Sequence, residues 1–190
     1  MESVVYTDDV EVRFDELPEI PWITFRWLMK QGVPPQALIH PELPKYARVV
    51  FHENLPYFDF ADDVGEDGRD ALVFLARNDL AEPCDMVAWT LSLKRLASWY
   101  GAAAILGADD ILAPRMISPG VLMVHRTPVG WLKAGREGVV IIEPRRAALE
   151  LRDLGPLAAE DEAHGHELRA LFRKQEPQFF VPNVERRTAS

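Results

Sequence analysis

The chain has 190 residues, of which 48% are hydrophobic, and a formal net charge of −9 at pH 7. This length suits one domain, and a single cysteine, Cys84, excludes an internal disulfide and fits a reducing compartment. The acidic excess repels phosphate, which disfavours nucleic acid as a partner. The first residues lack the pattern of a signal peptide and the apolar stretches are too short to span a bilayer. We therefore expect a cytoplasmic protein with no membrane partner.

The first segments in chain order predict a hairpin, a helix and a loop. Residues 10–14 alternate between apolar and polar side chains, which indicates a half-buried strand that pairs with residues 4–6. Pro21 and Gly32 bracket a mostly apolar helix, because Pro is favoured in the first turn and Gly just beyond the last. The segment 32–45 contains four prolines and is predicted to be a loop.

The middle of the chain predicts short strands followed by the longest helix. Strands are expected over 48–52 and 57–60, and an acidic loop over 61–70. The apolar run 71–76 predicts a central strand that is buried on both faces. A long helix is expected over 85–106, because apolar side chains recur there every three or four residues. The stripe they form consists of Met86, Trp89, Leu93, Leu96, Tyr100 and Ala103.

The second half of the chain alternates strands with helices. Strands are expected over 121–125 and 139–142, and helices over 128–135, 144–154 and 158–174. Such alternation favours crossover connections and a sheet covered by helices. We therefore predict the α/β class, with residues 1–176 forming a single layered domain in which helices cover a mixed sheet. An α+β arrangement is the alternative, and residues 177–190 are predicted to be a loosely held tail.

The ends of two predicted strands supply the candidate catalytic residues. His125 ends one strand and is followed by Arg126, and Glu143 ends the next. Ligands gather at the carboxyl ends of parallel strands, so these side chains would approach one another if the two strands run parallel. This arrangement would suit a small hydrolase or transferase. The alternative is that they only begin polar loops and cap the helices that follow.

The last predicted helix supplies the candidate metal ligands. Glu160, His164 and Glu167 recur at helical spacing, and carboxylate with imidazole can bind zinc or iron. The competing interpretation is that acidic residues in the first turn offset the helix dipole, while His164 packs at the edge of the buried stripe. We favour the second interpretation and predict no metal and no other cofactor.

Three further motifs lack residues that their chemistry requires. The stretch 130–135 has the glycine spacing of a phosphate-binding loop, but Arg136 and Glu137 stand where Lys and Ser or Thr are needed. The acidic loop 59–70 lacks the closing bidentate Glu of a calcium loop. Cys84 has no base near it in the sequence and is predicted to be a packing residue.

The preferred functional hypothesis is a bacterial accessory or protein-interaction domain, with a protein as its partner. The basic residues comprise 16 Arg and 5 Lys, a usage typical of GC-rich bacterial genomes and their prophages. Five tryptophans could anchor a core or a contact surface. The alternative is an enzyme with its site around His125 and Glu143. The core is predicted to contain Leu72, Phe74, Trp89, Leu93, Leu96, Val140 and Ile142.

Overall fold

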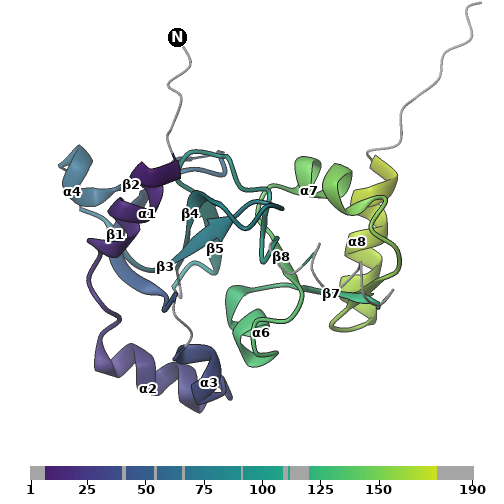
Figure 1. Cartoon of the computed structure of the whole chain (residues 1–190), viewed down its shortest axis with the longest axis horizontal. Coiled ribbons are helices and arrows are strands. Elements are labelled where there is room, and N and C mark those ends of the chain that lie inside the picture. Colours follow the sequence, from purple (N-terminus) through teal and green to yellow (C-terminus); the bar gives the residue numbers. More distant parts are fainter. Residues whose placement is uncertain are drawn as a thin grey trace, which may run out of the picture.

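The computed structural model describes residues 7–39, 42–53, 55–65, 67–90, 92–108, 111 and 120–174. Two sheets lie side by side along the long axis, the first built from the N-terminal half and the second from the C-terminal half (Figure 1). The predicted mixture of α and β structure is confirmed. The strands form a curled antiparallel sheet and a second, mixed sheet, where a single mixed sheet was expected. The predicted strand over 4–6 and the predicted tail lie outside the described residues.

Five antiparallel strands form the first sheet, in the order β2-β1-β3-β4-β5. Their bounds are Lys45–Phe51 for β1, Phe58–Phe60 for β2, Arg69–Arg77 for β3, Pro83–Thr90 for β4 and Arg95–Ser98 for β5. The strands predicted over 48–52, 57–60 and 71–76 are thus confirmed as β1, β2 and β3.

The central strand β3 is buried on both faces, as its continuous apolar run predicted. Its alternate residues belong to two different hydrophobic clusters. One cluster contains Leu72, Phe74 and Ala76, and the other contains Ala71, Val73 and Leu75. The first sheet is therefore packed on both sides, and neither side of β3 faces solvent.

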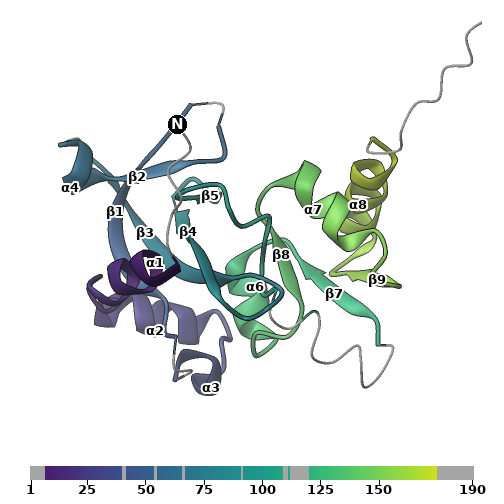
Figure 2. The same cartoon turned by 45° about the horizontal axis from the view of Figure 1, so that its top comes forward.

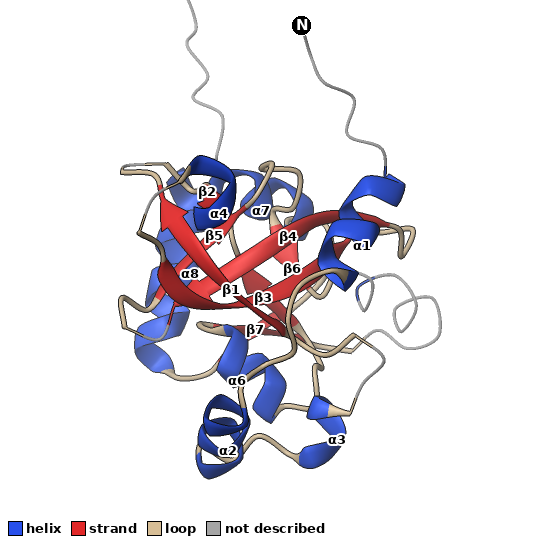
Figure 3. Ribbon diagram, turned by 90° about the vertical axis from the view of Figure 1, so that its left-hand side faces the viewer, coloured by secondary structure: helices blue, strands red, loops and turns tan. Residues whose placement is uncertain are grey.

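Four helices accompany this sheet: α1 (Thr7–Asp15), α2 (Trp22–Lys30), α3 (Pro35–Leu38) and α4 (Ala61–Val64). The helix predicted between Pro21 and Gly32 is confirmed as α2. The short helices α3 and α4 lie in segments that were predicted to be loops. In Figures 1 and 3, α2 and α3 project together from one end of the first sheet.

The strand predicted over 10–14 is wrong, because this segment lies in α1. Val10 and Phe14 are buried, whereas Val12 between them is exposed. Apolar residues at 10, 12 and 14 satisfy the period of a strand, but 10 and 14 alone satisfy the i, i+4 spacing of a helix. The two buried residues pack against the first sheet in one cluster with Phe58 and Met86.

Four strands form the second sheet, in the order β6-β8-β7-β9. Their bounds are Ile105–Leu106 for β6, Leu122–His125 for β7, Val139–Ile141 for β8 and Leu157–Ala159 for β9. Both β8 and β9 run parallel to β7, and β6 runs antiparallel to β8. The helices α6 (Pro128–Lys133), α7 (Pro144–Leu151) and α8 (Glu162–Lys174) follow β7, β8 and β9 in turn (Figure 2). The predicted alternation is confirmed, although the first two residues of the helix predicted over 158–174 lie in β9.

The long helix predicted over 85–106 is wrong, since this segment forms β4, β5 and β6. Strand β4 lies between β3 and β5 and is covered on both faces. Met86 and Ala88 belong to one hydrophobic cluster, and Val87 and Trp89 to the other. Burial on both faces removes the alternation that marks a strand, so only an apolar run with helical spacing remains in the sequence.

One hydrophobic cluster joins the two sheets. It includes Leu72, Phe74 and Trp89 from the first sheet, and Trp131, Val140 and Ile142 from the region of the second. Of the predicted core residues, Leu96 is only partly buried and Leu93 is exposed, while the other five are buried. No helix within the described ranges is both long and apolar enough to cross a membrane.

Candidate functional site

His125 ends β7, and both nitrogens of its buried ring are already bonded. Nε2 lies 2.9 Å from the carbonyl oxygen of Glu137, and Nδ1 lies 3.2 Å from Oε1 of Glu160. A carbonyl can only accept, so Nε2 donates to Glu137, and Nδ1 is left facing the carboxylate of Glu160. A general base needs a nitrogen that faces the substrate. The geometry suits a structural tie between β7 and its neighbours better than a general base.

Glu143 caps α7. Its carboxylate accepts hydrogen bonds from the backbone N–H groups of Arg145 at 3.2 Å and Arg146 at 2.6 Å. Both oxygens are therefore directed at the first turn of the helix, where free N–H groups need acceptors. The strands β7 and β8 are parallel as expected, but Glu143 is turned toward α7 rather than toward His125.

Arg126, the third candidate, forms a network with two acidic residues, one just before α8 and one within it. Its guanidinium donates to both carboxylate oxygens of Asp161, at 2.8 and 3.2 Å, and to Glu167 at 3.3 Å. The carboxyl ends of β7 and β9 are thus brought together, because Asp161 follows β9 and Arg126 follows β7. The sequence hypothesis paired the ends of β7 and β8 instead.

The three candidate metal ligands are turned toward different partners. Glu160 faces His125, and Glu167 faces Arg126. The ring of His164 accepts a hydrogen bond from the backbone N–H of Glu160 at 3.3 Å through Nδ1. Within the described part of the chain, no group of three or more His, Cys, Asp or Glu side chains is arranged to hold a metal ion. The prediction that the protein has no cofactor is not tested by these contacts and stays a prediction.

We expect His164 to make the stability of the protein depend on pH. Burial, together with the nearby Arg126, lowers the pKa of His164. The folded state then binds fewer protons than the unfolded state, so the free energy of unfolding falls as the pH drops below about 6.5. His164→Asn keeps an acceptor for the N–H of Glu160 but cannot titrate. Its destabilisation relative to wild type should therefore be larger at pH 8 than at pH 5, measured by urea unfolding.

The control is Leu149→Ala on the exposed face of α7, which removes no titratable group. The free energy of unfolding of this variant should differ from that of wild type by the same amount at both pH values. If the destabilisation relative to wild type changes with pH equally in the two variants, the pH dependence of stability does not come from His164.

The stretch 130–135 forms α6 and the turn after it, with Trp131 and Leu132 buried. Arg136 stands where a phosphate-binding loop needs lysine. Its guanidinium donates to the carbonyl oxygens of Ala37 at 3.2 Å and Glu42 at 2.7 Å. Arg136 therefore connects the end of α6 to the α3 region.

A residue that the sequence hypothesis missed, Asp85, organises the loop between the two sheets. Its carboxylate is completely buried. It accepts five backbone hydrogen bonds of 2.8–3.2 Å, from Met86, Trp99, Tyr100, Ala102 and Ala103. Burial raises the pKa of the Asp85 carboxyl, and these N–H groups oppose that shift. On the other side, Arg146 of α7 donates to the carbonyl oxygens of Gly101 and Ala102. A lone Asp at the start of an apolar run was the signal available in the sequence.

An exposed apolar surface lies on α2. Trp22 is 68% exposed and Ile23 is 72% exposed, and Met29, two turns further along the helix, is 43% exposed. Arg26 and Lys30 lie exposed among them. Of the five tryptophans, Trp22 is thus the one that could anchor a contact, because the other four are buried or half-buried. We call Trp22, Ile23, Arg26, Met29 and Lys30 the α2 face.

No family model, curated protein or solved structure matches this chain. We therefore infer the function from the geometry of the structure.

Proposed function

We propose that the protein is a protein-binding module that docks a partner segment on the α2 face. The observation that carries the proposal is the exposure of Trp22 and Ile23 on one helix. Large apolar side chains gathered on a surface mark interaction sites, and tryptophan is among the residues that contribute most to binding. A tryptophan that mainly filled the core would be covered, as Trp89 and Trp131 are.

The α2 face is one continuous strip of the helix. At 100° per residue, the five members of the face fall within about 120° of arc. The opposite side carries the buried Leu28, and the half-buried Phe25 and Trp27 pack against the core. The helix is thus held by one side and presents the other to a partner.

The charge of α2 indicates the chemistry of that partner. The helix sequence WITFRWLMK contains two basic residues and no acidic one, in a chain of net charge −9. A segment that is both apolar and acidic would complement this strip. Anionic membranes and nucleic acids are disfavoured as partners, because such large polyanions extend beyond the strip and meet the acidic remainder of the chain, whereas a short segment contacts the strip alone.

The predicted catalytic residues all make contacts within the fold. His125 is bonded at both ring nitrogens, Glu143 caps a helix and Arg126 is held by two carboxylates. Each has a structural use in the fold. The hydrolase or transferase hypothesis around His125 and Glu143 therefore gains no support from these contacts.

The test uses a fluorescein-labelled amphipathic peptide with glutamate on one helical face and leucine on the other. We expect saturable binding in fluorescence anisotropy. Trp22→Ala should weaken it about 30-fold, since truncating an interface hot spot costs about 2 kcal/mol or more. A peptide with lysine in place of glutamate should bind far more weakly. Because Trp22 is exposed, the variant should unfold within about 0.5 kcal/mol of wild type.

Leu80→Ala is the matched control, because Leu80 is equally exposed but lies in the turn between β3 and β4. Peptide binding should be the same in this variant as in wild type. The proposal fails if the acidic peptide does not bind, or if Trp22→Ala and Leu80→Ala affect binding equally. Binding to anionic vesicles in preference to the peptide would also overturn it.

A further inference from the structure

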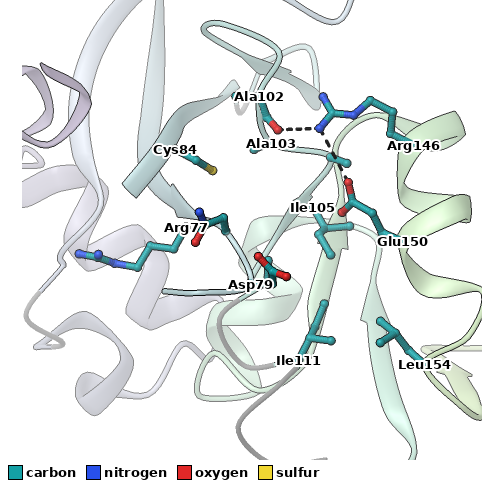
Figure 4. A pocket seen from close by; sticks show the side chains of 13 residues that line it. Arg77, Asp79, Cys84, Ala102, Ala103, Ile105, Ile111, Arg146, Glu150 and Leu154 are labelled. Atoms are coloured by element: carbon teal, nitrogen blue, oxygen red, sulfur yellow. Dashed lines mark hydrogen bonds and ion pairs between the residues drawn. The ribbon is translucent and has the colours of Figure 1, made fainter. Parts of the chain in front are cut away.

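A cavity of about 390 Å³ lies among the β3–β4 turn, the loop that Asp85 holds, and α7 (Figure 4). This volume falls within the range of small-molecule sites. The cavity is far in the sequence from the α2 face, and none of the α2 face residues lines it.

One wall of the cavity is apolar. Ile105 lines it from β6 and Ala104 from the residue before that strand, and Leu154 lines it from the turn after α7. Cys84 of β4 also lines the cavity, and Figure 4 shows its sulfur directed inward. Burial raises the pKa of the Cys84 thiol to about 12. The thiol is therefore neutral near pH 7 and acts as an apolar surface rather than as a nucleophile.

The polar side of the cavity carries two carboxylates, Asp79 and Glu150, both directed inward in Figure 4. Within the described part of the chain, Asp79 forms no hydrogen bond or ion pair. Glu150 has Arg146 3.8 Å away. Burial raises the pKa of the Glu150 carboxyl. Arg146 opposes this shift, whereas the negative charges of Asp79 and Glu143 add to it.

The arginines that line the cavity are already engaged. Arg146 is directed at the carbonyl oxygens of Gly101 and Ala102. Arg77 donates to Glu11 and Glu42, and Figure 4 shows its guanidinium pointing away from the cavity. Among the described residues, two carboxylates therefore line the open volume beside one cation that is not turned away from it, Arg146, which leaves these groups with one more negative than positive charge.

We propose that this cavity binds a small organic cation, a primary amine with an apolar body. The ammonium group lies toward Glu150 and Asp79, and the body packs on Ala104, Ile105 and Leu154. An ammonium donates three hydrogen bonds to carboxylate oxygens and restores the charge balance. The apolar body gains by leaving water for the apolar wall.

The test is ligand-observed NMR and calorimetric titration with benzylamine and n-hexylamine, each compared with its neutral counterpart, benzyl alcohol or n-hexanol. We expect each amine to bind once per chain in the millimolar range or tighter, and the alcohols to bind much more weakly. Glu150→Gln and Asp79→Asn should each weaken amine binding about tenfold, the factor expected for a hydrogen bond between charged groups. Asp153→Asn, an exposed carboxylate beyond the end of α7, is the matched control and should bind as wild type does.

The same ammonium chemistry occurs on the lysine side chain of a peptide. Nα-acetyl-lysine methylamide is therefore titrated alongside, and tighter binding of this compound than of the free amines assigns the site to a peptide-borne lysine. Asp79 is exposed, so Asp79→Asn remains informative if Glu150→Gln unfolds. The proposal is overturned if no amine binds, if the alcohols bind as well as the amines, or if the carboxylate variants leave amine binding unchanged.

Discussion

Asp85→Ala is expected to lower the free energy of unfolding by about 4 kcal/mol or more. The substitution removes the acceptor of five backbone N–H groups in a site that water does not reach. An unsatisfied buried donor costs about 1–3 kcal/mol, and relaxation of the loop can restore water to only some of the five. The loop between the two sheets should therefore lose its fixed conformation.

Asp85→Asn separates the effect of losing hydrogen bonds from the effect of losing side-chain volume, because Asn and Asp have nearly the same volume. The amide keeps one acceptor oxygen, but its NH₂ group faces backbone donors, so a loss of about 2–3 kcal/mol is expected. Asp153→Ala, which removes an exposed carboxylate, should change stability by less than about 0.5 kcal/mol. Urea unfolding measures all three variants. A loss below about 1 kcal/mol in Asp85→Ala would show that the loop does not depend on this carboxylate.

Trp89→Ala is expected to cost about 3–5 kcal/mol. Trp89 is 5% exposed and pairs with Leu72 of β3 and Leu96 of β5 in the first sheet. Its cluster also contains Trp131 and Val140, so the cavity left by the substitution would open between the two sheets. The cost has two parts, the lost free energy of burying the indole ring away from water and the free energy of the cavity left behind.

Trp22→Ala provides the comparison for Trp89→Ala, because it removes the same side chain from an exposed position. Thermal unfolding should separate the two variants by many degrees, with Trp22→Ala close to wild type. Equal melting temperatures for Trp89→Ala and wild type would refute the placement of Trp89 in the core.

Elements with local signals at their ends could be predicted from the sequence. Thr127 caps α6 through a hydrogen bond from the N–H of Gly130 at 3.2 Å, and Pro128 takes the first helical position. Glu143 and Pro144 begin α7 in the same way. The sequence alternative that Glu143 caps a helix agrees with this contact. These signals act within a few residues, so no knowledge of the packed structure was needed.

The candidate site could be predicted only in part. The sequence identified Trp22 as one of five possible anchors, but its exposure depends on which side of α2 the core covers. The two carboxylates of the cavity, Asp79 and Glu150, lie far apart in the chain and meet only because α7 packs beside the β3–β4 turn. No periodicity in the sequence relates two such positions.

Caps, prolines and local periodicity were enough to predict α2, α6, α7 and the strand–helix alternation after residue 122, and a continuous apolar run was enough to predict β3. Contacts between distant parts of the chain were needed to establish that residues 10–14 form a helix and that 85–106 form strands. In residues 10–14 the apolar spacing satisfies two periods at once, and in 85–106 burial on both faces removes the alternation that would mark a strand. The choice depends on neighbours distant in the chain: for β4 these are β3 and β5 on either side, and clusters on both faces. Asp85 likewise acquires its role from N–H groups up to 18 residues away, because a buried carboxylate must find its donors wherever the fold brings them.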